Sequence, residues 1–362
     1  MKLGVDLIFV TGTKGGMETY VRELYRRLPD HLPGAELVGY ASRQLASEGA
    51  SWFPGALVDT GIDGDDRAAW ARGTMVGVGR RAMRDRVDLL HAPANFGPIG
   101  WAPPTVLTVH DLIAHRHPEY VPSSYAPIIR GMVRLASRRA ARLLTPSDAT
   151  AADLRSLLGV PGTRIDVTPL ASTIPPTATG APAERQVLIV GNRMPHKNVT
   201  VVLDALVLMD PVDRPRVVLT GGGAGDPLPA EVVRRGLTDH VAITGWLSDE
   251  ELDSLYRASR LVVLPTRFEG FGLPVLEAMA RGVPVLCSDL GVLREVAGGA
   301  ARYVDSTDPA AVARELLALL DDAGERERLR LAGAARAAAF TWDRTTALTA
   351  RSFIRAADRR RG

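Results

Sequence analysis

Apolar and polar positions follow two kinds of spacing along this chain, and segments of the two kinds alternate. Short runs rich in Val, Leu and Ile end in turn residues and are followed by longer Ala, Arg and Leu segments with helical spacing. This alternation is typical of βα units around parallel sheets. In the first half, the predicted strands are 3–10, 37–41, 87–92, 105–111 and 142–147, and the predicted helices are 17–28, 66–85, 124–142 and 148–158.

The pattern stops once and then restarts. Residues 173–184 (TIPPTATGAPAE) contain prolines and a glycine without an apolar period, so they are predicted to be a linker. The later predicted strands are 185–192, 216–223, 240–246, 260–266, 283–289 and 301–305. We therefore expect two Rossmann-like, doubly wound α/β domains, 1–172 and 185–340, and a C-terminal helix at 341–362 that crosses back towards the first domain.

Composition narrows the class of protein. The 362 residues are 46% hydrophobic and 23% charged, which suits two folded globular domains and provides no membrane-spanning run. A single cysteine, Cys287, excludes an intramolecular disulfide and fits a reducing compartment, so a cytoplasmic location is expected. A net charge of +3 does not indicate a nucleic-acid partner. Lysine is rare, and Lys14 and Lys197 both lie in glycine-rich or polar loops.

Ligands of parallel sheets bind at the carboxyl ends of the strands, so the site is expected in a cleft between the two domains. The first candidate is TGTKGGMETY (11–20), where Gly15 and Gly16 would let the backbone approach a ligand closely. A plain strand-to-helix turn is the alternative. Neither a G-x-G-x-x-G fingerprint nor a P-loop is present, which argues against nicotinamide and NTPase functions.

His110 and Asp111 end the predicted strand 105–111. A histidine at this place is often structural, but at a strand's carboxyl end it can instead donate a hydrogen bond or position a substrate hydroxyl. His115 and His117 follow without carboxylate or cysteine ligands at metal spacing, so no metal site is expected.

Two cations follow the first strand of the second domain in GNRMPHKN (191–198). Arg193 and Lys197, beyond Gly191, precede a predicted helix whose N-terminus favours negative charge. Because each cation adds charge-assisted hydrogen bonds, the segment is suited to a diphosphate. A solvated loop is the alternative.

The segment RFEGFGLPVLEAMA (267–280) is the most specific in the chain. Glu269 lies in a predicted loop and Glu277 lies two turns into the following helix. The turn between them is formed by Gly270, Phe271, Gly272 and Leu273. Its N–H groups and the two carboxylates can grip a phosphate and sugar hydroxyls along one line.

Together these motifs resemble the retaining glycosyltransferases of glycosyltransferase family four, which have the GT-B architecture. The resemblance also includes SDATAADL (147–154), TGGG (220–223), GWLSDEELDSLY (245–256) and residues 288–305, so it covers nearly the whole chain. It implies transfer of a sugar from a nucleotide diphosphate donor, with retention and without a metal or cofactor. The family often has lysine-glycine where this chain has Lys197 and Asn198.

The resemblance also implies roles for single residues. Arg193 and Lys197 would hold the diphosphate and Glu277 the ribose. Glu269 would hold the donor sugar with the amides of residues 271–273. From the first domain, Gly16 would approach the phosphates and His110 the sugar, while Trp246 and Leu247 would border the base. The HD and lysine-asparagine forms look most like mannosyltransferases, so GDP-mannose is the first expected donor and a UDP-sugar the second.

The acceptor stays open between a glycan, a lipid-linked molecule and a small molecule. The rival functions are a nucleotide-sugar epimerase or hydrolase on the same fold and a non-enzymatic sugar-binding protein. Arg130, Arg134 and Arg138 are spaced by four, and Arg142 continues this row within residues 130–142. The row is either a solvated face, the more ordinary interpretation, or a peripheral contact with anionic lipid at the inner face of the membrane.

Overall fold

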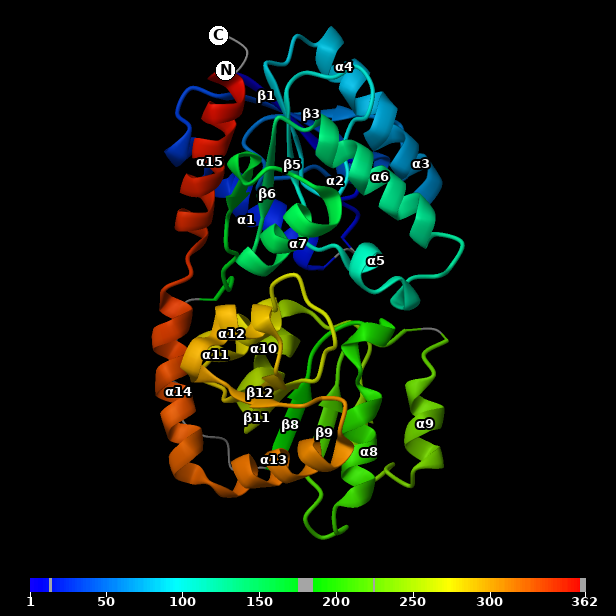
Figure 1. The fold of residues 1–362 in the computed structure, drawn as a ribbon, viewed down its shortest axis with the longest axis vertical. Helices are drawn as coiled ribbons and strands as arrows, with labels where there is room; N and C mark the ends of the chain where they lie inside the picture. The colour runs from blue at the N-terminus through cyan, green and yellow to red at the C-terminus, as the bar shows by residue number, and fades with distance from the viewer. Residues whose placement is uncertain (13–14, 175–184, 224, 359–362) are drawn as a thin grey trace. The chain divides into compact units, whose positions relative to one another are not determined.

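The computed structural model describes residues 1–12, 15–174, 185–223 and 225–358. The chain forms two compact units, Met1–Leu170 with Thr341–Gly362, and Ala171–Phe340 (Figure 1). Each unit is described by itself. Lys14 and residues 175–184 of the expected linker lie outside the described residues.

The first unit contains a parallel sheet whose order is β3-β2-β1-β4-β5-β6-β7. Its strands are β1 Lys2–Leu7, β2 Glu36–Ala41, β3 Ala56–Asp59, β4 Leu89–Ala92, β5 Thr105–Thr108, β6 Arg142–Thr145 and β7 Ile165–Val167. The chain leaves β1 towards β2 and later returns to the other side of β1 with β4. Such a reversal of strand order is where doubly wound sheets bind ligands.

Helices cover this sheet. They are α1 Gly16–His31, α2 Arg43–Glu48, α3 Arg67–Arg72, α4 Val78–Arg84, α5 Ile113–Arg116, α6 Ala126–Arg139, α7 Asp148–Leu158 and α15 Trp342–Asp358. Helix α15 packs along α1 and against β4, β5, β6 and β7. The Phe353 ring of α15 contacts the His91 ring of β4 at a centroid distance of 5.1 Å.

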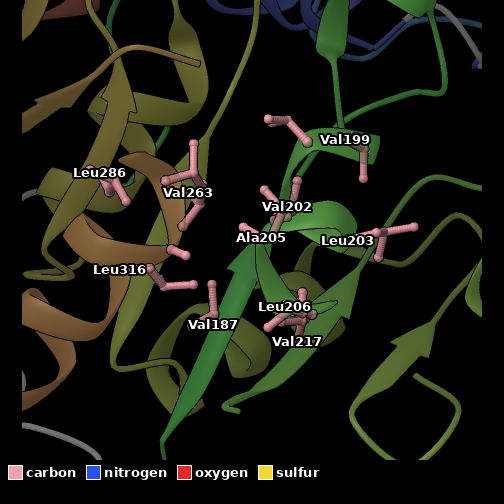
Figure 2. Close-up of a cluster of buried hydrophobic side chains, with 14 of the residues drawn as sticks. Val187, Val199, Val202, Leu203, Ala205, Leu206, Val217, Val263, Leu286 and Leu316 are labelled. Atoms are coloured by element: carbon pink, nitrogen blue, oxygen red, sulfur yellow. The ribbon is translucent and has the colours of Figure 1, made fainter. Parts of the chain in front are cut away.

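The second unit repeats the design with the order β10-β9-β8-β11-β12-β13. Its strands are β8 Gln186–Ile189, β9 Arg216–Leu219, β10 Val241–Ile243, β11 Leu261–Leu264, β12 Val285–Ser288 and β13 Arg302–Val304. Its α-helices are α8 Thr200–Leu208, α9 Leu228–Arg234, α10 Asp249–Ala258, α11 Leu273–Ala280, α12 Gly291–Ala297, α13 Pro309–Asp321 and α14 Ala323–Ala338. Figure 2 shows Ala205 and Leu206 of α8 packed near Val187 of β8 within the core.

The predicted strands are confirmed, and two more exist at the edges of the first sheet. These are β3 and β7, whose sequences ALVD and IDV are short and half-exposed. The predicted helix 66–85 is divided by a π-helical turn at Gly73–Gly77. No helix in the described ranges is long and apolar enough to cross a membrane.

The arginine row at 130–142 needs one correction. Helix α6 ends at Arg139, and Arg142 is a buried residue of β6 that is 6% exposed. Its Nε and Nη2 donate to the two oxygens of Asp166 on β7, at 2.5 and 2.6 Å. Arg142 therefore joins two strands and is not part of a surface row.

Asp166 also ties the returning helix to the sheet. Ser352 Oγ of α15 donates to Asp166 at 2.6 Å, and Arg355 of α15 lies 3.3 Å from the same carboxylate. Burial alone would raise the pKa of Asp166, but hydrogen bonds from Arg142 and Ser352 lower it overall. The carboxylate is therefore ionised in the fold and holds β6, β7 and α15 together.

Replacing Asp166 by alanine is expected to destabilise the protein by about 3 kcal/mol or more, because the buried Arg142 guanidinium loses its counter-charge. Urea unfolding measures this loss. The matched control is Glu325→Ala, which removes a carboxylate from an exposed ion pair with Arg328 and should cost less than about 1 kcal/mol. Equal losses in the two variants would contradict the assigned role of Asp166.

Candidate active site

In the second unit, the loops after β8 and β9 pack closely through their backbones and form the base of the candidate site, called its floor below. Gly191 follows β8 with φ +142°, and Gly221 follows β9 with φ +79°. A Cβ built on Gly221 would lie 2.3 Å from the Gly191 carbonyl oxygen, so only glycine allows the two loops to meet. The loop after β9 is also tied to the one after β10, because Gly221 N–H donates to the Gly245 carbonyl at 3.1 Å.

Arg193 is fixed above this floor. Its Nε donates to Asp226 Oδ2 at 2.9 Å and its Nη1 donates to the Thr220 carbonyl at 2.5 Å. Its Nη2 is buried and has no hydrogen-bond partner among the described residues. A Cβ on Gly222 would lie 3.4 Å from this nitrogen, so the glycine leaves space beside it. The guanidinium thus holds a fixed geometry and keeps donor capacity for an anion.

Lys197 and Glu269, predicted for different parts of one substrate, contact each other directly. Lys197 Nζ lies 2.7 Å from Glu269 Oε1, and the side chains are only 17% and 11% exposed. Their loops are also joined by the backbone, since Arg267 N–H donates to the His196 carbonyl at 2.7 Å. The ammonium has three donors, so the ion pair leaves it able to bind a second anion.

Asn198 explains how this chain departs from the lysine-glycine form of the motif. Its backbone is left-handed, with φ 52° and ψ 34°, a conformation that glycine adopts freely and asparagine tolerates. Its Nδ2 donates to the carbonyls of Pro265 and Ser306, at 3.1 and 2.8 Å. Asparagine therefore keeps the turn that follows Lys197 and adds an anchor to the neighbouring loops.

Glu277 lies on α11, two turns from Glu269, in a different environment. Tyr256 of α10 donates its hydroxyl to Glu277 Oε2 at 3.1 Å. Burial raises the pKa of Glu277, while the charge of Arg281 acts to lower it. One donor occupies only part of the carboxylate's acceptor capacity, so hydroxyls of a ligand can still bind there.

The turn between the two glutamates presents its backbone rather than its side chains. Phe271 is buried and packs edge-on against Phe340 at 6.0 Å. Gly272 has φ +97°, and a Cβ there would lie 2.5 Å from a Leu293 methyl group. The N–H groups of residues 271–273 start α11 and form no hydrogen bond within the described chain. Gly270 lies half-buried at the start of this turn.

Trp246 and Leu247 lie after β10, in the loop that joins Gly221. Trp246 is largely exposed and Leu247 is half-buried. The backbone bonds of Gly221 and Gly222 to the carbonyls of Gly245 and Thr244 connect this loop to the floor below Arg193. The second unit thus places its predicted residues in the loops at the carboxyl ends of β8, β10 and β11 and on helix α11, which follows β11.

His110 of the first unit lies just beyond the end of β5. Its Nε2 lies 2.8 Å from the Pro93 carbonyl, which can only accept, so Nε2 carries the proton. Burial lowers the pKa of His110 to about 4, so the ring is neutral at physiological pH and Nδ1 is an acceptor. Asn95 Oδ1 accepts from the His110 backbone N–H at 2.6 Å, and Tyr20 packs edge-on at 5.1 Å.

The other predicted residues of this unit have local roles. Asp111 Oδ1 accepts from the Ile113 N–H at 3.0 Å and starts α5. Gly15 precedes α1 with φ +56°, and Gly16 is the first, exposed residue of the helix. Glu18 Oε1 accepts from the N–H groups of Thr11 and Gly12, both at 2.9 Å, and so shapes the start of this glycine loop.

Sequence reasoning missed Asp226, Asn95, Tyr256 and Glu18, which hold the predicted residues or their loops. The TGGGAGD segment (220–226) carried one usable signal, an aspartate at the end of a glycine-rich turn. Among the described residues, no group of three or more His, Cys, Asp or Glu could hold a metal ion.

Two family models cover most of the chain. "Glycosyltransferase Family 4" matches residues 14–171, and "Glycosyl transferases group 1" matches residues 177–336. The chain belongs to glycosyltransferase family 4. The O-antigen chain mannosyltransferase B of Escherichia coli is 32% identical over 292 residues, which are 75% of this chain and 76% of that protein. This membership confirms the resemblance seen in the sequence and makes the chain a glycosyltransferase.

A second mannosyltransferase among the relatives agrees with the branch suggested by the HD and lysine-asparagine motifs. The MMP alpha-(1->4)-mannosyltransferase of Mycolicibacterium hassiacum is 32% identical over 68% of this chain and 64% of that protein. The D-inositol 3-phosphate glycosyltransferase of Salinispora tropica is 30% identical over 92% of this chain and 80% of that protein. Family 4 relatives of this chain therefore differ in their substrates.

Solved structures confirm the fold. A sucrose-phosphate synthase from Thermosynechococcus elongatus superposes with a TM-score of 0.77 at 17% identity and covers 98% of each chain. Anabaena HepE, solved in complex with UDP and glucose, gives 0.72 at 18% identity over 97% of this chain and 98% of that one. The two Rossmann-like units are those of the GT-B architecture.

The depressed pKa of His110 makes stability depend on pH. The unfolded ring binds a proton below about pH 6.5 while the folded ring stays neutral to about pH 4, so stability present above pH 6.5 is lost as the pH falls towards 4. From about pH 7 to about pH 5 the native protein should lose about 2 kcal/mol more than His110→Gln. Urea unfolding at both pH values measures this; an equal loss in both proteins would contradict a neutral, buried ring.

Proposed function

We propose that this glycosyltransferase moves a hexose, with retention, from a nucleotide diphosphate sugar to a hydroxyl group of an acceptor. The observation that carries the proposal is the pair of mostly buried cations beyond β8, Arg193 and Lys197. Each is held by a carboxylate and each keeps donors for an anion. A leaving diphosphate gains negative charge as the anomeric bond breaks, and preorganised donors stabilise that charge most.

The carboxylate partners set how the cations act in this proposal. Asp226 fixes the orientation of the Arg193 guanidinium, whose Nη2 has no partner in the described fold, and Glu269 orients Lys197. Glu269 also has a second oxygen for hydroxyls of the donor sugar, and the free amides of residues 271–273 add donors beside it. Because the fixed cations donate hydrogen bonds to the leaving group, we propose that the reaction uses neither a metal ion nor a cofactor.

Ribose and base would be held further along the same unit. Glu277 accepts hydrogen bonds from the ribose hydroxyls. Its carboxylate can do so because the hydrogen bond from Tyr256 occupies only part of its acceptor capacity. Trp246 and Leu247 border the base from the loop after β10. GDP-mannose is the first candidate donor because mannosyltransferases are among the relatives. A UDP-sugar is second, and the structural neighbour HepE was solved with UDP.

The first unit would complete the site with neutral groups. In the proposal, His110 accepts a hydrogen bond from a donor-sugar hydroxyl through Nδ1, Asp111 contributes to the same subsite, and Gly15 and Gly16 approach the phosphates. The acceptor is a glycan, a lipid-linked molecule or a small molecule, recognised by the first unit. The single cysteine, Cys287, cannot form an intramolecular disulfide, which supports a cytoplasmic location in this proposal.

A thermal-shift panel of GDP, UDP, ADP and dTDP, first without metal and then with magnesium, tests the donor site. A ligand that binds only the native state increases the free energy of unfolding, by about 2.7 kcal/mol when its concentration is 100 times its dissociation constant. The melting temperature rises as a result. One nucleotide is expected to give a selective shift without metal. A shift that needs magnesium would overturn the metal-free proposal, and shifts by free sugars alone would overturn the donor site.

The donor named by the panel then tests the reaction. Proton NMR of the product should show the anomeric configuration of the donor, and inversion would contradict retention. Release of free nucleotide without acceptor, as fast as transfer with acceptor, would favour a hydrolase. Conversion of the donor into a second nucleotide sugar would favour an epimerase.

Lys197→Ala and Glu277→Ala should each lower turnover by about 10²-fold, because each removes a charged contact to the leaving nucleotide. The matched control is Lys2→Ala, which removes a lysine paired with Glu36 in the first unit and should leave turnover unchanged. Melting temperatures confirm that the variants are folded. Near-normal turnover in both site variants would show that the donor site lies elsewhere.

A further inference from the structure

Helix α6 of the first unit presents apolar side chains to solvent among arginines. Ile128 and Leu135 are 58% and 46% exposed, and Tyr125, next to the helix start, is 50% exposed. Ile128 and Leu135 are seven residues apart, which is close to two helical turns, so they share one face. The opposite side of α6 is anchored in the core through Val133 and Ala136.

The described part of the chain provides no counter-charge for the arginines of α6. Exposed Arg130, Arg134, Arg138 and Arg139 form no ion pair with any described residue. Residues 120–147 contain no aspartate or glutamate at all. The positive field also reaches a neighbour, because burial and then the charges of Arg130 and Arg134 lower the pKa of His115.

Arginine is the common cation of this chain, so α14 provides a comparison. Its Arg328 and Arg330 pair with Glu325 and Glu327 of the same helix, at 2.7 and 2.6 Å. An exposed arginine of this protein, such as Arg328, can therefore form an ion pair with a glutamate three residues away on its own helix. Helix α6 has no such glutamate. Like charges four residues apart repel each other, so the row on α6 has a cost that an external anion would remove.

We propose that the exposed face of α6, formed by Ile128, Leu135 and the four arginines, docks on an anionic phospholipid bilayer. The arginines contact lipid phosphates while the isoleucine and leucine enter the boundary between headgroups and acyl chains. Charge complementarity selects an anionic surface, and the exposed aliphatic side chains select a bilayer over a nucleic acid. Arg142, buried in β6, takes no part.

Flotation with vesicles tests this surface in the full-length protein. Vesicles of phosphatidylglycerol and phosphatidylcholine should carry the protein at low salt, binding should weaken as salt rises, and vesicles of phosphatidylcholine alone should not carry it. Arg134→Gln with Arg138→Gln should weaken binding by about 25-fold, at about fivefold for each arginine. Ile128→Ser with Leu135→Ser should weaken it by about tenfold or more.

The matched control is Arg328→Gln with Arg330→Gln on α14, which removes the same charge from another helix and should change binding less than about twofold. An equal loss in this control would reduce the effect to net charge and overturn the proposal. So would absence of flotation with anionic vesicles, or a dimer in solution that the Ile128→Ser and Leu135→Ser substitutions dissociate. Nucleotide shifts do not depend on α6, so this proposal and the proposed function fail separately.

Discussion

Two mostly buried ion pairs fix the cations of the candidate site in the second unit: Arg193 with Asp226, and Lys197 with Glu269. A cation taken out of water without a partner is strongly unfavourable, so these carboxylates allow the cations to stand in the fold before any anion arrives. They also balance the charge of the site. In the proposed function, the diphosphate would therefore meet donors that are already oriented and would bind to the hydrogens that the carboxylates leave unused.

Those ion pairs depend on where the loops run, and the loops depend on the sheet. Asp226 follows β9 and Glu269 follows β11, the two strands that flank β8 in the sheet. Parallel strands deliver their carboxyl ends to one edge, so residues 33 and 72 positions away reach Arg193 and Lys197. Gly221 and Asn198 supply the positive φ angles that let these loops pack closely.

The sequence predicted this framework well, because Val and Leu runs between turn residues mark buried parallel strands. It missed β3 and β7, whose edge positions do not require continuous apolar runs. Lys197 was found because lysine is rare and because it follows a strand together with Arg193, and Glu269 was found separately in the EGFGLPVLE motif; their ion pair was not predicted. Asp226 and Asn95 were not found, since their roles arise from contacts between loops that are distant in the sequence. Arg142 was misplaced because a spacing of four continued past the end of a helix.

The predicted site residues of the two units are groups of different kinds. In the first, burial lowers the pKa of His91 to about 3 and that of His110 to about 4, so both rings are neutral at physiological pH. His91 is fully buried and bonds to Tyr25 and Thr108, whereas His110 lies just beyond the end of β5. In the second, fixed charges surround the place where the cations lie. Neutral hydrogen-bonding groups discriminate hydroxyls by geometry, whereas fixed charges bind any anion of suitable shape. In the proposed function, substitutions among the loops of the first unit would therefore alter which hydroxyl is selected without disturbing the charges that are proposed to stabilise a leaving diphosphate.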